Sequence, residues 1–520
     1  NWIIPVERRR ELLERAILRQ PGDLGLLMSL GSTYPVNHRE GADQRVRWFQ
    51  VALGINPTNM GARINLGSAL LDLGDLAGAE AQNREAIRLE PNNALSHHNL
   101  GWVLYNRGNL SSAEEEYLEA IRLDPNSALS HNNLGLILDR SGNLAAAEIK
   151  YREAIRLDPK LAIPHNFLAW LAVRKNDLRL AELEYREALR LDSTYYHSHN
   201  GLGWVLEKKG DWDGAETEYR KTIQLEPRYA LAHCNLGRML DRKKVEDGAE
   251  VEYRQAIRYD ANLKEPHFHL GVLLRQKGDL AGAEAEFRAA IRLDRNDPHP
   301  HNSLGYLFQY FTGDLKRAIA EYEEALKLDP MFSAAANNLA SAVRMQALLK
   351  RLPDILVGKS APTTPTEACE FASLCRQRFL KRFAAAVRLY DGAFNADTAI
   401  TSDLIANNRY DAACLAALAA RGEGADSPED AEGRTTLRTK ALAWLRAELV
   451  HHKKQAISPN ITERKAATDA LSHWLKDKDF SRLRPTEARI EMSSKERADW
   501  DALWIEVRAT IAEAPKSGPS

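Results

Sequence analysis

The sequence predicts an all-α fold in which helix pairs repeat along the chain and stack into a solenoid. Three observations predict it. The stretch 92–125 recurs at once as 126–159, and both copies are 34 residues long. Apolar residues follow helical spacing in both halves of each copy. A proline closes many of the copies, at Pro57, Pro91, Pro125, Pro159 and Pro227, whereas one copy ends in Ser193. A fixed period of this length is typical of stacked two-helix units that bury their apolar faces against one another.

Each copy is expected to form two helices joined by a short turn. In the copy 92–125, Leu100, Gly101 and Leu104 lie on one face of the first helix. Gly108 follows that helix, where a left-handed C-terminal cap favours glycine, and Asn109 then caps the second helix. Small residues recur opposite one large residue per copy, which lets neighbouring helices approach to about 8–10 Å. The large residues are Tyr117, Tyr151, Tyr185, Tyr219, Tyr253, Phe287 and Tyr322.

These recurring residues resemble the tetratricopeptide repeat (TPR) family. The residues that carry the resemblance are Leu100-Gly101, Ala113, Tyr117, Ala120 and Pro125, together with their recurrences. The resemblance implies a right-handed TPR superhelix, an α-solenoid, followed here by a smaller C-terminal helical domain. It also implies a concave groove that is lined by the first helices and binds peptide segments of partner proteins.

The period sets the expected domain boundaries. Residues 1–22 form an N-terminal capping helix, and the TPR array spans 23–330. Its copies are a degenerate first one at 23–57 and then 58–91, 92–125, 126–159, 160–193, 194–227, 228–261, 262–295 and 296–330, the last with one inserted residue. After the array we expect a second capping helix at 331–352, a linker at 353–367, a C-terminal helical domain at 368–514 and a disordered tail at 515–520.

The C-terminal portion resembles a second kind of sequence. Its segments RYDAACLAALAARGEG, ALSHWLKDKDFSRLRP and ERADWDALWIEVRATI follow one another as in the region after the repeats of planctomycete-type bacterial serine/threonine protein kinases. The resemblance implies a kinase domain in the parent chain upstream of Asn1, which is not a methionine. The 520 residues themselves contain no Gly-rich loop, no His-Arg-Asp catalytic loop and no Asp-Phe-Gly motif.

Composition excludes several classes of function. The 71 Lys and Arg against 72 Asp and Glu leave a net charge of −1, so no global basic field attracts nucleic acid. The four cysteines are sparse and unpatterned, which fits a reducing cytoplasm. We find no apolar run of membrane-spanning length and no catalytic motif. We therefore expect no enzyme activity in these residues, no metal, no cofactor and no membrane association, and a cytoplasmic location.

A histidine recurs every 34 residues at one position of the first helix. The ladder consists of His97, His131, His165, His199, His233, His267 and His301. Equivalent residues of stacked repeats lie about 10 Å apart, too far to share one metal ion. We interpret the histidines as packing residues. A weaker hypothesis is that they become charged near pH 6 and loosen the stack.

The expected peptide groove carries asparagines and large aromatic residues. An asparagine amide both donates to and accepts from a peptide unit, and tryptophan and tyrosine dominate binding hot spots. The candidate groove residues are Asn99, Trp102, Asn132, Asn133, Asn166, Trp170, Asn200, Trp204, Asn235, Arg238, Asn302 and Tyr306. The slot before the Leu resembles the asparagine ladder of the O-linked N-acetylglucosamine transferase family. The alternative is that these asparagines only join neighbouring helices. The lysines that clamp acidic C-terminal tails in other TPR proteins are missing, which argues against that ligand.

Two hypotheses for function follow. In the first, the chain is a non-catalytic scaffold whose solenoid binds protein or peptide ligands. In the second, it is the regulatory and substrate-docking end of a serine/threonine kinase. The oligomeric state is left open.

Overall fold

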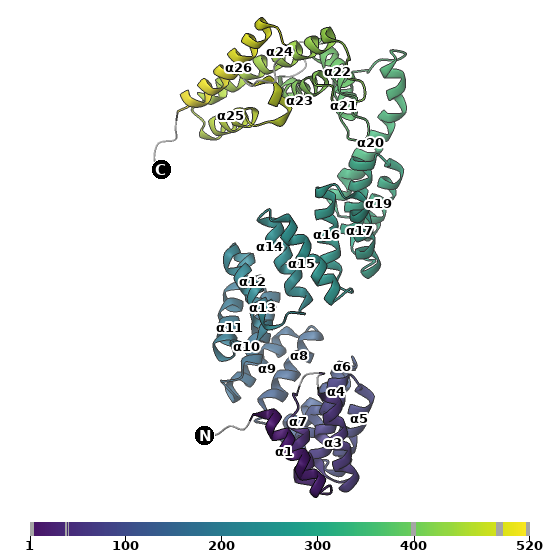
Figure 1. Cartoon of the computed structure of the whole chain (residues 1–520), viewed down its shortest axis with the longest axis vertical. Helices are drawn as coiled ribbons and strands as arrows, with labels where there is room; N and C mark the ends of the chain where they lie inside the picture. The colour runs from purple at the N-terminus through teal and green to yellow at the C-terminus, as the bar shows by residue number, and fades with distance from the viewer. Residues whose placement is uncertain (1–4, 37–38, 40, 397–401, 485–491, 516–520) are drawn as a thin grey trace. The chain divides into compact units, whose positions relative to one another are not determined.

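The computed structural model of the chain describes residues 5–36, 39, 41–396, 402–484 and 492–515. All regular elements within these ranges are helices, and no strand occurs among them. The chain divides into two units, residues 1–261 and residues 262–520. Figure 1 shows each unit as a succession of helices that run back and forth. The predicted all-helical repeat architecture is confirmed.

Unit 1 holds the first part of the repeat array. From α2 onward, even-numbered helices are the first and odd-numbered helices the second of each pair. The helices are α1 (Val6–Arg19), α2 (Leu24–Gly31), α3 (Ala42–Ile55), α4 (Met60–Leu73), α5 (Leu76–Leu89), α6 (Ala94–Asn106), α7 (Leu110–Leu123), α8 (Ala128–Arg140), α9 (Leu144–Leu157), α10 (Ala162–Arg174), α11 (Leu178–Leu191), α12 (Tyr196–Lys209), α13 (Trp212–Leu225), α14 (Ala230–Arg242) and α15 (Glu246–Tyr259).

The small-against-large pairing holds each repeat together. A Cβ added to Gly135 in α8 would lie only 2.7 Å from Cε1 of Tyr151 in α9, so the ring rests directly on the glycine. Gly237 and Tyr253 show the same 2.7 Å approach. No larger residue fits there without moving the ring, because a packed core accommodates even one methyl group poorly.

Unit 2 contains the end of the array and the C-terminal helices. Its elements are α16 (Lys264–Lys277), α17 (Leu280–Leu293), α18 (Pro298–Leu307), η1 (Phe308–Thr312), α19 (Leu315–Leu328), α20 (Ser333–Leu356), α21 (Pro365–Cys375), α22 (Phe383–Ala396), α23 (Ser402–Ala420), α24 (Ala431–Ala456), α25 (Ile461–Trp474), η2 (Lys478–Leu483) and α26 (Ser494–Glu513). The inserted residue of the copy 296–330 is absorbed in η1, a short π-helix that continues α18.

The helix after the array extends beyond its expected end. We expected a linker from Pro353 onward, but α20 runs through Pro353 to Leu356. Leu352 and Ile355 are both buried, and this burial favours the helix on either side of the proline. Of the expected tail, residues 516–520 lie outside the described residues, as do residues 1–4 of the N-terminal segment.

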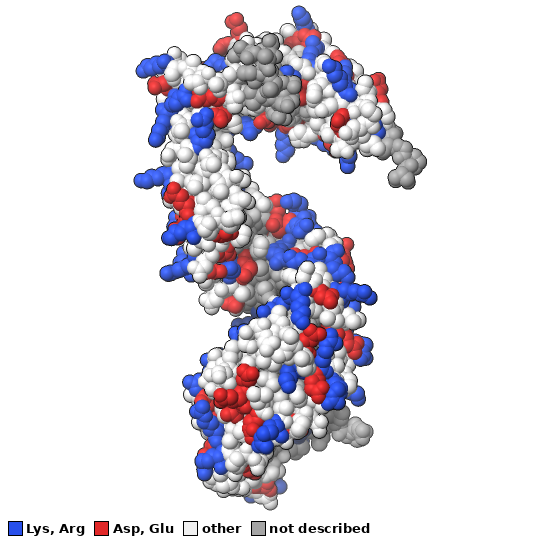
Figure 2. All heavy atoms as spheres, turned by 180° about the vertical axis from the view of Figure 1, so that it is seen from behind, with Lys and Arg blue, Asp and Glu red and all other residues white. Residues whose placement is uncertain are grey.

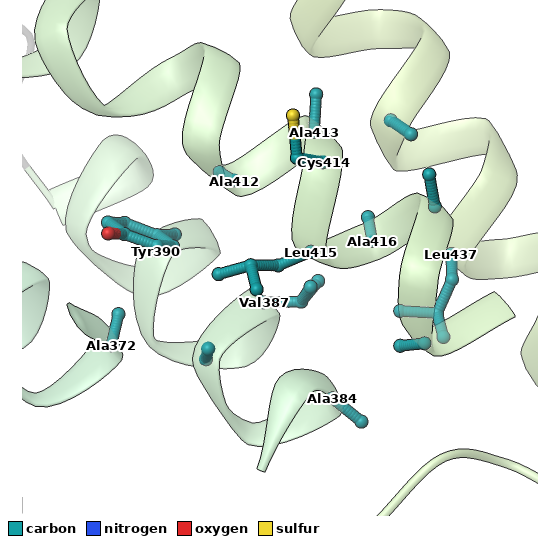
Figure 3. Close-up of a cluster of buried hydrophobic side chains, with 14 of the residues drawn as sticks. Ala372, Ala384, Val387, Tyr390, Ala412, Ala413, Cys414, Leu415, Ala416 and Leu437 are labelled. Carbon is teal, nitrogen blue, oxygen red and sulfur yellow. The ribbon is translucent and has the colours of Figure 1, made fainter. Parts of the chain in front are cut away.

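The C-terminal helices form one apolar core. Figure 3 shows side chains of α22, α23 and α24 in this core, among them Val387, Leu415 and Leu437. Trp500 and Trp504 of α26 are completely buried in the same cluster. The Trp504 indole Nε1 donates to the Leu483 carbonyl at 2.9 Å, so its polar atom is satisfied.

Candidate functional site

The predicted groove residues of unit 1 lie on its first helices. We call the surface that they form on α6, α8, α10, α12 and α14 the first-helix face. Neighbouring first helices contact one another, α6 with α8, α8 with α10 and α10 with α12. The residues of this face therefore belong to one continuous surface within unit 1. Asn302 and Tyr306 occupy equivalent positions on α18 of unit 2.

Most asparagines of the first-helix face form hydrogen bonds with a neighbouring repeat. The Asn235 amide donates to Asn200 Oδ1 at 3.1 Å, and the Ser198 hydroxyl donates to Asn166 Oδ1 at 3.0 Å. Asn132, Asn166, Asn200 and Asn235 are all buried. These bonds join neighbouring repeats, as the alternative interpretation proposed, and a direct role in holding a ligand stays a prediction.

Two further asparagines complete this pattern. The Asn133 amide accepts from Asn132 at 3.0 Å and donates to the Tyr117 hydroxyl at 3.3 Å. In unit 2, the Asn338 amide donates to Asn302 Oδ1 at 2.9 Å. Asn99 is half-buried on α6. The asparagine slot therefore acts repeatedly as a connector between the helices of successive repeats.

The aromatic residues are the accessible part of the face. Trp170 is 50% exposed, which is unusual for so large an apolar side chain. Trp102 stacks on Tyr105 with ring centroids 5.3 Å apart, and Trp204 lies under the Lys208 ammonium at 5.2 Å. In unit 2, Tyr306 is 37% exposed. Partly exposed rings held by neighbours are suited to bind another apolar surface.

Arg238 is not available as an independent cation. Its guanidinium pairs with Glu207 of the preceding first helix, and the Tyr219 hydroxyl donates to the same carboxylate at 3.0 Å. Burial opposes the charge on Arg238, but the Glu207 carboxylate outweighs it and raises the arginine pKa. This partly buried ion pair therefore joins α12 to α14.

A hollow of about 510 Å³ opens within the first-helix face of unit 1. We call it the aromatic hollow, because rings supply much of its wall. Its lining residues are Tyr105, Leu136, Asp139, Arg140, Asn166, Phe167, Trp170, Tyr185, Tyr195, His197, Asn200, Gly201, Tyr229 and Leu231. Three of them, Asn166, Trp170 and Asn200, were predicted as groove residues, whereas the tyrosines that line the hollow were not.

Tyr185 and Gly201, from two successive repeats, line the hollow together. In most copies the second-helix tyrosine rests on the glycine of its own repeat, but the copy 160–193 has Ala169 there. The Tyr185 ring lies against Gly201 of the next repeat, where an added Cβ would come within 2.3 Å of Cζ. Gly201 replaces an asparagine of the ladder, and Phe167 replaces another. These interruptions of the ladder were the signal for the hollow.

Most histidines of the ladder join the first helix of their repeat to the second helix. In six rungs the histidine Nδ1 contacts a glutamate of the second helix, and the distance is 2.6–2.7 Å. In several rungs Nε2 also contacts a backbone carbonyl, as in His233 with Pro227 at 3.0 Å. Burial opposes the charge on His233, but the bonds to Glu252 and to that carbonyl outweigh it and raise the pKa. At His233, protonation therefore strengthens the contact between the two helices, which is the opposite of the loosening hypothesis at this position.

One histidine of the ladder, His131, lacks a glutamate partner. Lys150 stands where the six copies with a paired histidine have glutamate, and His131 Nδ1 is buried without a hydrogen-bond partner. Burial lowers the His131 pKa, and the Lys150 charge lowers it further. The contact from His131 Nε2 to the Pro125 carbonyl, at 3.2 Å, remains.

The described residues contain one group with metal-ligand types, Cys414, Asp477 and Asp479 in the C-terminal helices. Both oxygens of Asp477 are already engaged, one by the Tyr410 hydroxyl at 2.5 Å and the other by the Asp479 backbone N–H at 2.9 Å. Burial raises the pKa of the Cys414 thiol, so it stays protonated. A neutral thiol beside the engaged carboxylate of Asp477 does not form a prepared metal site.

Surface charge is mixed. Figure 2 shows basic and acidic side chains interspersed over both units on the face in view. Any charge preference of the first-helix face must therefore come from its local groups.

Within the described residues, no helix has the length and apolar character that crossing a membrane requires.

Comparison with known proteins identifies the repeat. The model of a tetratricopeptide repeat family matches residues 49–94, 98–162, 168–230, 201–262, 247–298 and 309–353, which together make up more than half of the chain. The chain belongs to the tetratricopeptide repeat family. No curated protein matches its sequence.

Several solved structures are similar to this chain at low sequence identity. The Cut9–Hcn1 hetero-tetramer of the APC/C is 18% identical with a TM-score of 0.44, and the match covers 65% of this chain and 59% of that one. The human IFIT1 dimer with PPP-AAAA is 16% identical with a TM-score of 0.44, covering 76% and 95%. YrrB, described as a TPR protein with an unusual peptide-binding site, is 24% identical with a TM-score of 0.30, covering 36% and 96%. At these identities the likeness concerns the fold alone.

Proposed function

We propose that this TPR chain is a non-catalytic scaffold that binds segments of partner polypeptides on the first-helix face of unit 1. The observation that carries the proposal is the exposure of Trp170, at 50%, beside a hollow walled by aromatic rings. A large apolar side chain held in water costs free energy that a bound partner would recover. Family membership supports the proposal, because TPR domains generally bind proteins or peptides.

Peptide selection tests the proposal although the partner is unidentified. Random peptides displayed on phage are selected on the immobilised chain, and the enriched peptides are titrated against purified protein. We expect enrichment, and we expect affinity to fall at least about tenfold in the triple variant Trp102→Ala, Trp170→Ala and Trp204→Ala, because truncating hot-spot aromatics costs about 2 kcal/mol or more.

A matched control separates loss of the face from general damage. Trp212 on α13 is a second-helix tryptophan that packs under the Arg242 guanidinium at 3.9 Å. The Trp212→Ala variant should bind the selected peptides as the wild type does. Failure to enrich any peptide, or equal affinity for wild type and the triple variant, would contradict the proposal.

The C-terminal helices support a second proposal, that the scaffold is the docking region of a serine/threonine kinase. The observation that favours it is the order of segments in 368–514, which fold around the single core containing Trp500 and Trp504. Reading the coding sequence upstream of Asn1 tests it. A kinase domain is expected there, and a start codon immediately before Asn1 would exclude it.

A further inference from the structure

The aromatic hollow has walls that are rigid before any ligand arrives. The His197 ring meets the Tyr229 ring edge-on at 5.4 Å, and Tyr195 meets His197 in the same way at 5.5 Å. On another wall, Phe167 stacks on Tyr151 at 5.8 Å. Rings that hold one another lose little freedom when a ligand binds, which favours affinity.

The walls are also uncharged at neutral pH. Burial lowers the pKa of His197 and raises the pKa of Tyr195 and of Tyr229 to about 12 each. The hollow therefore presents neutral aromatic faces and edges around neutral pH. Such a surface favours a planar apolar group, which can stack on one ring and meet others edge-on.

The two ionised residues of the rim differ in availability. Asp139 is buried and its carboxylate pairs with Arg174, so its charge is already balanced. Arg140 is exposed, and its guanidinium lies 5.1 Å from the centre of the Tyr105 ring. Among the described residues, no carboxylate lies within ion-pair distance of Arg140. The rim therefore offers one unbalanced positive charge.

The size of the hollow limits what it can hold. A volume of about 510 Å³ falls in the range of ligand pockets and has room for one large side chain and part of its backbone. A guanidinium beside an apolar pocket suits a carboxylate, which it can bind through two parallel hydrogen bonds. A cationic ligand would be repelled by Arg140, because the nearby carboxylate of Asp139 is already paired.

We propose that the aromatic hollow is the anchor site for an aromatic side chain of a partner polypeptide, and that Arg140 binds an acidic residue next to that side chain. The inference rests on the proposed function and specifies its ligand. The carboxylate belongs to a side chain within the segment, so the site differs from a clamp for an acidic C-terminal tail. Asn166 and Asn200, although buried, lie in the wall and orient the neighbouring repeats around it.

Three labelled nonapeptides test the inference by fluorescence anisotropy. Each has Gly and Ser at both ends, with Asp-Trp-Asp, Asp-Ala-Asp or Lys-Trp-Lys at the centre. We expect the acidic tryptophan peptide to bind at least about tenfold tighter than either of the others, since the ring and the carboxylate each contribute. Added salt should weaken its binding, because Arg140 is exposed.

Two variants of the chain complete the test. Arg140→Glu should weaken the acidic tryptophan peptide at least about tenfold and improve the lysine-flanked one. Leu231→Trp should block the hollow, because Leu231 lines it and is 37% exposed, so a larger side chain there fills the hollow without disturbing the core. Trp212→Ala, outside the hollow, should leave binding unchanged.

The outcomes separate the inference from the proposed function. If phage-selected peptides bind through the tryptophans of the first-helix face but the acidic tryptophan peptide does not bind at about 1 mM, the inference is overturned and the proposed function stands. Preference for the lysine-flanked peptide, or equal binding by wild type and Arg140→Glu, also overturns it. If no peptide of any kind binds, the inference and the proposed function are both contradicted.

Discussion

Replacing Lys150 by glutamate would complete the histidine ladder. In six rungs a glutamate accepts from the histidine Nδ1 at 2.6–2.7 Å, whereas His131 Nδ1 is buried and unpaired. Glu153 and Arg156 also act on the charge of His131, with opposite signs, and Lys150→Glu leaves both unchanged. The substitution should therefore create one bond of known geometry between α8 and α9.

The magnitude follows from the other rungs. A hydrogen bond to a charged group contributes about 1.5–3 kcal/mol. The accepting glutamates keep 13% to 25% of their side-chain surface exposed in the rungs of His165 and His97, so solvent weakens the bond. We expect a gain in the free energy of unfolding of about 1–2 kcal/mol at pH 5.5.

The sign of the pH dependence is set by the pKa of His131. In the wild type this pKa is lowered in the folded state, so stability is lost as the pH falls below the ordinary histidine value. With a glutamate partner the folded pKa of His131 should be raised, as Glu252 and the Pro227 carbonyl raise that of His233. The added stability is then fully present below the unfolded pKa and lost as the pH rises through the folded one. The gain at pH 5.5 should therefore exceed the gain at pH 8.

Thermal unfolding and histidine NMR titration measure these effects. Lys150→Glu is compared with wild type at pH 5.5 and pH 8, each also in a His131→Gln background, so that a double-mutant cycle isolates the pair. The extra gain at pH 5.5 should vanish with His131→Gln. An unchanged or lower His131 pKa in Lys150→Glu, or an equal gain at both pH values, would refute the reasoning.

Three further predictions concern packing and charge. Gly201→Ala should destabilise unit 1 by about 1–3 kcal/mol because its Cβ would meet the Tyr185 ring. Ala169→Gly should rescue this loss, because the ring could then move toward residue 169, where most other copies have glycine. Lack of rescue in denaturant unfolding would contradict this account of Tyr185. Trp504→Ala should cost the C-terminal helices about 3–5 kcal/mol, and unchanged near-ultraviolet circular dichroism would contradict its burial. The pKa of Glu367 is lowered to about 2, first by Arg351 and then by Thr363. The wild type should therefore lose stability as the pH falls from about 4.5 toward 2. The Glu367→Gln variant should not show this loss.

The repeat architecture was predictable because each two-helix unit contains the residue pattern that predicts its own fold. Tyr151 and Gly135 recur at fixed spacing, and the structure places them in direct contact. The same periodicity predicted helices in the C-terminal portion, where Trp500 and Trp504 lie on the buried face of α26. Local pattern is sufficient where each residue has the same neighbours in every copy.

The candidate site was less predictable because it depends on departures from the repeat. The aromatic hollow is lined by Tyr185 and Gly201, which belong to different copies and lie in direct contact. The bonds of Asn200 and Asn235 likewise cross from one copy to the next. A single averaged repeat contains none of these relations. The helical continuation through Pro353 was missed because burial of Leu352 and Ile355 offsets a local signal.

The central claim is that the first-helix face of unit 1 holds a partner polypeptide. Hydrogen–deuterium exchange of the intact chain, with and without a saturating phage-selected peptide, tests it most directly. The account predicts slower exchange concentrated in α8, α10 and α12, with the second helices α9, α11 and α13 little changed. Protection confined to those second helices, or to α21–α26, would contradict it.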